Sequence, residues 1–161
     1  MKKLFFALLG LALPHLTWAQ LVTFNATLTG SQETPPNSSP AMGWATATLD
    51  TTTSEFSVDL TFSGLVATET AAHLHFAPLG SPGPVVLPLP LGSSVHVTTM
   101  LDATSVNELM QGLWYANVHS TVYRAGEIRG QLLPVPEPST YALAGVLLLG
   151  VAAAVRRQRR S

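Results

Sequence analysis

Cysteine is absent from the sequence, and only 11% of its 161 residues are charged. Without thiols the chain has neither a disulfide framework nor a thiolate zinc site, so an apolar core must hold the fold together. Intrinsic disorder is also excluded, because 47% of the residues are hydrophobic and the formal net charge is only -1. The sequence therefore predicts an ordinary globular domain, for which this length is sufficient.

Basic residues are nearly missing from the middle of the chain. Of the eight in the sequence, only Arg124 and Arg129 lie between Gln20 and Pro134, whereas eight acidic residues lie there. The middle segment therefore carries a net charge of -6. Such a surface repels a polyanion, so we expect no nucleic-acid partner.

The first 19 residues follow the pattern of an export leader. Two lysines precede an apolar run over residues 4–13, and small residues flank Trp18 ahead of a cleavage point between Ala19 and Gln20. This combination is typical of a signal peptide that signal peptidase removes. We therefore expect a signal helix over residues 1–19.

The C-terminal residues have the pattern of a membrane anchor. Residues 141–155 contain no charge, and four arginines follow within residues 156–161. An apolar segment with a basic flank predicts a transmembrane helix whose flank stays in the cytoplasm. Its 15 residues are few against the roughly 20 that span a bilayer, which suits a temporary anchor. A Pro-rich linker at 134–140 joins it to a domain at 20–133.

Pro136, Glu137 and Pro138 lie in this linker, directly before the anchor. A Pro-Glu-Pro element, an apolar stretch and an arginine cluster in this order resemble the PEP-CTERM sorting signal of Gram-negative bacteria. The resemblance implies that an exosortase recognises the Pro-Glu-Pro element and removes the hydrophobic tail. It also implies transient anchoring in the inner membrane, and a mature protein at the cell surface or in an extracellular polysaccharide matrix.

Apolar and polar residues alternate through most of the domain. Alternation is clearest in residues 56–62, and it predicts half-buried strands. The strands expected in this way are 22–28, 43–49, 56–62, 70–76, 85–89, 94–98, 113–121 and 127–133. A short helix is predicted at 106–111, with a capping box that begins at Ser105 and a stop at Gly112. Turns at intervals of about ten residues predict an all-β fold, an antiparallel β-sandwich or a flattened Greek-key barrel.

Three histidines form the most informative polar pattern. His73 and His75 occupy alternate positions of one predicted strand, so both imidazoles project from the same face. His119 lies on the polar face of another strand, and the three rings converge if these strands are neighbours. Neutral imidazole is a common ligand of copper and zinc, so the pattern predicts a metal site. Three further side chains would orient these rings or place a charge beside them: Asn117, Glu127 and Arg129.

The same residues also allow other interpretations. The His-x-His pair is compatible with a structural cluster that hydrogen-bonds the loop at 78–84. Four aromatic side chains would suit a sugar-binding platform, although Trp114 is expected rather in the core: Trp44, Trp114, Tyr115 and Tyr123. The sequence has no Gly-x-Ser-x-Gly motif and no cysteine nucleophile, so no residue is assigned a catalytic role.

Several motifs together resemble the CHRD domain, named from chordin, over residues 21–133. In chain order they are Phe24-x-Ala26-x-Leu28-x-Gly30, Glu33-Thr34-Pro35-Pro36, Gly43, Ala72-His73-Leu74-His75, Gly83-Pro84-Val85-Val86, Tyr115-x-Asn117-Val118-His119 and Gly126-Glu127-Ile128-Arg129-Gly130-Gln131-Leu132. The resemblance implies a β-rich extracellular module, found in bacterial secreted proteins mostly without an assigned activity.

The histidine spacing also resembles the copper-ligand layout of Cu/Zn superoxide dismutase, another antiparallel β-barrel. On that resemblance the ligands are His73, His75 and His119, and a fourth ligand could come only from His96. The disulfide and the His-rich zinc loop of that enzyme have no counterpart, so dismutase activity is not expected. Our leading hypothesis is an exported matrix or surface protein with a non-enzymatic binding or structural role. The alternatives are a copper or zinc domain and a carbohydrate-binding module.

Overall fold

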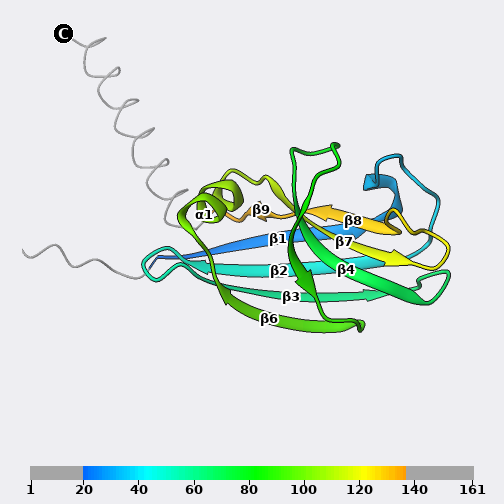
Figure 1. Cartoon of the computed structure of the whole chain (residues 1–161), viewed down its shortest axis with the longest axis horizontal. Helices are drawn as coiled ribbons and strands as arrows, with labels where there is room; N and C mark the ends of the chain where they lie inside the picture. The colour runs from blue at the N-terminus through cyan, green and yellow to red at the C-terminus, as the bar shows by residue number, and fades with distance from the viewer. Residues whose placement is uncertain (1–19, 137–161) are drawn as a thin grey trace, which may run out of the picture.

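The computed structural model describes residues 20–136 of the chain (Figure 1). The signal helix expected at 1–19 and the transmembrane helix expected at 141–155 lie outside the described residues, as do Glu137 and Pro138. In the part of the chain that the structure describes, no helix is long and apolar enough to cross a membrane.

Residues 20–136 form nine strands, one α-helix and one 3-10 turn. The elements are β1 (Leu21–Thr29), η1 (Gly30–Gln32), β2 (Met42–Asp50), β3 (Glu55–Ser63), β4 (Glu69–Phe76), β5 (Val85–Leu89), β6 (Ser94–Met100), α1 (Ala103–Met110), β7 (Trp114–Ser120), β8 (Ile128–Gln131) and β9 (Leu133–Pro134). The predicted all-β class is confirmed, and each predicted strand has a counterpart. The strand expected at 127–133 is divided into β8 and β9.

The strands pair antiparallel in a single sheet. Their order is β5-β4-β7-β8-β1-β2-β3-β6, and β9 adds a short pairing to β1. Figure 1 shows the sheet curling over on itself into a flattened, nearly closed barrel, with α1 beside one end. The order places β4 next to β7, although about 40 residues separate them in the chain.

The core lies between the two halves of the curled sheet. Alternate residues of each strand point inward, as the period of two requires. Fully buried members of this set are Phe24, Leu28, Ala45, Leu49, Phe56, Val58, Leu74, Trp114, Ala116, Val118 and Ile128. Phe56 of β3 meets Trp114 of β7 edge to face, with ring centroids 5.8 Å apart, so this aromatic pair joins the two halves.

Helix α1 begins three residues earlier than predicted. Its N-cap is Asp102, whose side chain accepts a hydrogen bond from the Ser105 backbone N–H at 2.7 Å. The expected cap, Ser105, lies instead in the first turn, because the carboxylate of Asp102 already satisfies a free N–H there. The predicted stop is confirmed, since Gly112 adopts a φ of 69°, which favours glycine.

The two ends of the described chain leave the barrel at the same end (Figure 1). Pro134, expected in the linker, pairs with Phe24 of β1, and the Val135 N–H donates to the Thr23 carbonyl at 2.8 Å. Gln20 is held nearby, because its carbonyl accepts from the Thr51 N–H at 3.1 Å. The folded body therefore extends to one residue before Pro136.

Truncation of Leu60, which is 1% exposed on β3, tests the packing of the core. Leu60→Ala should lower the free energy of unfolding by about 3 kcal/mol, because it leaves a cavity between the two halves of the sheet. Leu91→Ala is the control, since Leu91 is 64% exposed, and it should change stability by less than about 0.5 kcal/mol. Denaturant unfolding measures both values, and equal losses would contradict this core.

Candidate metal centre

The three histidines lie on the outer side of two paired strands. β4 and β7 are antiparallel neighbours, with His73 opposite Asn117 and His75 opposite Tyr115. His119 lies opposite Ala71, which makes it a diagonal neighbour of His73 on the same face. The strand pairing on which the sequence hypothesis depended is therefore present, and it brings the three rings together.

Their nitrogen atoms form a compact group. His73 Nδ1 lies 3.3 Å from His119 Nε2, and one nitrogen from each of the three rings lies within 4.8 Å of the others. Zinc and copper bind imidazole nitrogen at about 2.0–2.1 Å, so ligand nitrogens around one ion are roughly 3.3–3.6 Å apart. The longest separation exceeds that range by about 1 Å, which small rotations about the side-chain bonds can close.

Two of the rings are oriented by backbone carbonyls. His75 Nδ1 lies 3.0 Å from the Gly83 carbonyl, and His119 Nδ1 lies 3.0 Å from the Arg124 carbonyl. A carbonyl only accepts, so each of these Nδ1 atoms carries the proton in the neutral ring, and each Nε2 keeps its lone pair. Metal-binding histidines are commonly held by such a second hydrogen bond. Both rings are thus prepared to offer Nε2 to an ion.

The environment favours the neutral imidazoles that a metal requires. Burial lowers the pKa of His73, His75 and His119, and for His73 the charges of the other two rings lower it further. His75 is 9% exposed, and its Nε2 has no hydrogen-bond partner among the described residues. A buried lone pair without a partner costs free energy unless something else is bound there.

The side chains of His75, Tyr115 and Arg129 form a stack, in that order. The Tyr115 ring lies parallel to the His75 ring, with centroids 4.8 Å apart and an angle of 6°. The guanidinium carbon of Arg129 lies 3.4 Å from the centre of the Tyr115 ring, a close cation–π contact. Arg129 therefore places its charge one ring away from His75, and its charge adds to burial in lowering the pKa of His75.

The loop at 78–84 covers this stack. Its Gly83 N–H donates to the Tyr115 hydroxyl at 3.2 Å, and its Ser81 carbonyl accepts from Arg129 at 2.7 Å. Gly83 leaves no room for a side chain, since a Cβ there would lie 1.8 Å from the Phe76 carbonyl oxygen. The hydrogen bond between the His-x-His pair and this loop, expected for a structural cluster, is present, and it places the proton of His75 on Nδ1 and leaves Nε2 with its lone pair.

Asn117 and Glu127 make contacts away from the imidazoles. The Asn117 amide donates to the buried carboxylate of Glu33 at 3.1 Å. Glu127, fully buried, accepts instead from the Ser39 hydroxyl and the Val66 N–H, both at 2.7 Å. Glu127 was expected to orient a histidine, but among the described contacts it holds two loops together.

His96 does not join the cluster. It lies on β6, an edge strand, with its Nδ1 2.8 Å from the Asp59 carboxylate. Among the described residues the group of possible ligands consists of His73, His75 and His119 only. The fourth copper ligand that the dismutase resemblance would take from His96 is therefore not at the site.

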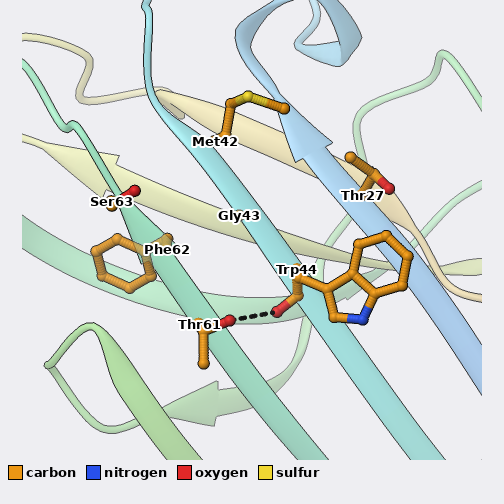
Figure 2. A pocket seen from close by; sticks show the side chains of 7 residues that line it. All are labelled: Thr27, Met42, Gly43, Trp44, Thr61, Phe62 and Ser63. Atoms are coloured by element: carbon orange, nitrogen blue, oxygen red, sulfur yellow. Dashed lines mark hydrogen bonds between the residues drawn. The ribbon is translucent and has the colours of Figure 1, made fainter.

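The expected aromatic platform is not formed. Trp114 and Tyr115 are buried, at 1% and 3% exposure. Trp44 is exposed on β2, where it lines an open groove of about 450 Å³ with Met42 and Thr61 (Figure 2). Tyr123 lines a different cavity of about 290 Å³. The burial of Trp114 in the core is as expected, but Trp44 and Tyr123 lie on different surfaces, so the four side chains do not form one platform.

Glu33 also belongs to this region, since it accepts from Asn117, and the sequence patterns did not predict a role for it there. It is 5% exposed, and burial raises its pKa to about 7, although the charge of Arg129 opposes the rise. Its position before Pro35 and Pro36, outside any strand, gave no periodic signal. The only hint was an acidic residue inside the motif that resembles the CHRD domain.

The fold and the site define a β-barrel domain with a three-histidine cluster on its outer face. The family model of the CHRD domain matches residues 24–132, and the chain belongs to this family. A second model, the PEP-CTERM protein-sorting motif, matches residues 134–160. The resemblances to the CHRD domain and to the PEP-CTERM sorting signal are thereby confirmed. The curated proteins gave no match to the chain, and neither did the solved structures.

Substitution of Glu33 tests its raised pKa. The folded state holds the Glu33 proton more tightly than the unfolded state, whose pKa is 4.5, so this residue's contribution to stability falls as the pH rises through about 7. Relative to Glu33→Gln, the unmodified protein should lose up to about 3 kcal/mol of unfolding free energy between about pH 5 and pH 8. The histidines are present in both proteins, so their opposite pH dependence cancels in the difference. A pH-independent difference would contradict the buried carboxyl.

Proposed function

We propose that the chain is a non-enzymatic surface or matrix protein whose CHRD domain binds one transition-metal ion through His73, His75 and His119. The export part of this statement follows from the PEP-CTERM motif, which makes the chain an exported protein sorted with the help of an exosortase. The metal part is supported by the geometry of the cluster. Copper and zinc are the ions that imidazole nitrogen suits best here.

The observation that carries the proposal is the buried Nε2 of His75, which lacks a partner among the described residues. The Nε2 atoms of His75 and His119 both carry a lone pair, because the proton of each ring is on Nδ1. Within the three-histidine cluster, His73 Nδ1 is the one remaining nitrogen that could donate a proton to them. One proton cannot satisfy both acceptors. A single cation placed between the three rings accepts the Nε2 lone pairs of His75 and His119, and it accepts the Nδ1 lone pair of His73 when the proton of that ring lies on Nε2. It thereby removes the cost of the unpartnered nitrogen.

The arrangement of the chain ends supports the delivery part of the proposal. Gln20 and Val135 are both hydrogen-bonded into the barrel, on neighbouring parts of the sheet. Cleavage by signal peptidase before Gln20 and processing beyond Pro136 would therefore leave all paired strands intact. We infer that the domain at 20–133 is delivered whole, by way of the transient membrane anchor at 141–155 and its tail at 156–161.

Removal of one ligand tests metal binding. The purified chain should hold about one equivalent of copper or zinc after loading and dialysis, and His75→Ala should lose it, because two imidazoles bind far more weakly than three. His96→Ala is the matched control, since it removes a histidine outside the cluster and should keep the metal. Elemental analysis gives the stoichiometry. Full metal content in His75→Ala would contradict the proposed site.

Substitution of Glu137 tests the sorting step. In cells that contain the matching exosortase, Glu137→Gln should leave the chain unprocessed in the inner membrane, because it removes the charge of the Pro-Glu-Pro element while keeping its size. The control is Val135→Ala, which keeps both prolines and the backbone hydrogen bond to Thr23. Cell fractionation and the mass of the product measure the outcome. A Glu137→Gln chain that reaches the cell surface at the normal mass would contradict this role.

A further inference from the structure

We propose that the cluster of His73, His75 and His119 selects monovalent copper, Cu(I), and that Arg129 is the positioning residue that sets this preference. The inference rests on the proposed function, since it names the ion that the same three rings bind. It comes from three features of the described residues: the charge of the ligands, the charge behind them and their number.

The ligand set contributes no negative charge. The group that could hold an ion contains three imidazoles and no carboxylate among the described residues. A divalent ion bound there would keep its full double charge in a partly buried site. The cost of moving an ion out of water grows with the square of its charge, so a monovalent ion is far less penalised.

The charge behind the ligands is positive, and the nearby carboxyl of Glu33 compensates it only in part, because a pKa raised to about 7 leaves that carboxyl partly protonated at neutral pH. Arg129 is 1% exposed, and its guanidinium lies against the ring that stacks on His75. All its hydrogen bonds go to neutral acceptors: the Thr34 hydroxyl, the Ser81 and Pro78 carbonyls and the Gln131 side-chain amide oxygen. No carboxylate pairs with Arg129 within 4 Å among the described residues. Its repulsion acts twice as strongly on a divalent ion as on a monovalent one.

The number of ligands also favours Cu(I). Zinc is almost always four-coordinate, and Cu(II) prefers four ligands in a square or tetragonal arrangement. Cu(I) is stable with three nitrogen ligands alone, whereas Zn(II) would need a water molecule as its fourth ligand. His96, the one other histidine of residues 20–136, is paired with Asp59 on another strand and supplies no fourth nitrogen.

The loop at 78–84 keeps this arrangement rigid. Gly83 binds both His75, through its carbonyl, and Tyr115, through its N–H. Arg129 anchors the same loop through Ser81. His75, Tyr115 and Arg129 are thus all hydrogen-bonded to the same loop. The same loop therefore holds Arg129 and His75 in place relative to each other.

Competition experiments on the full chain, purified in detergent, test the preference. We expect one equivalent of Cu(I), measured without oxygen against bicinchoninate, with an affinity at least about 100-fold above that for Zn(II), measured against a zinc-binding dye. His75→Ala should abolish both. Zinc binding that equals or exceeds Cu(I) binding, completed by a water molecule, would overturn this inference and leave the proposed function standing. No binding of either ion would overturn both.

Arg129→Gln tests the role of the charge, with Arg129→Lys as the matched control that keeps it. Loss of the charge should lower the ratio of Cu(I) to Cu(II) affinity at least about tenfold, which lowers the copper reduction potential by about 59 mV for each factor of ten. Arg129→Lys should keep most of the ratio. A merely structural role would weaken both oxidation states equally and leave the potential unchanged, and that result would overturn the role of Arg129.

The unmodified protein gives a second measurement that does not depend on a variant that folds. Its copper reduction potential should lie above that of aqueous copper, because the site stabilises the lower charge. A potential at or below the aqueous value would overturn the preference for Cu(I), even if elemental analysis shows a full equivalent of copper on the three histidines.

Discussion

The antiparallel pairing of β4 with β7 is the constraint on which both the core and the site depend. On its inner side this pairing buries Leu74 against Ala116, and on its outer side it collects the three imidazoles. A shift of one residue in register would exchange the two faces and place imidazoles in the core. The apolar packing that stabilises the barrel therefore also fixes the geometry of the histidine cluster.

Residue alternation was sufficient to predict the strands and to place His73, His75 and His119 on one face. It succeeded because the inner faces are uniformly apolar, which is a local property of each strand. The helix start was missed for a local reason too, since the capping box at Ser105 competes with the stronger cap at Asp102. Which strands are neighbours is a property of the whole sheet. The sequence alone therefore predicted only that the three rings converge if β4 and β7 are neighbours.

The burial of the outer face was beyond sequence reasoning. Tyr115, Asn117 and Gln131 alternate with core residues, which predicts exposure, yet each is at most 5% exposed. The reason is that loops at 33–37 and 78–84 fold over this face, and loops carry no periodic signal. The stacking of Arg129 on Tyr115 and the raised pKa of Glu33 both result from this cover. The outer face around these residues is thus both polar and buried.

The short pairing of β9 with β1 has a consequence for the lifetime of the protein outside the cell. Among residues 20–136, Val135 is the last one hydrogen-bonded to the sheet, so a chain cut shortly after it would end close to the barrel. Proteolysis concentrates at chain ends that are not tied down. A chain cut shortly after Val135 would therefore offer exopeptidases little unpaired backbone at that terminus.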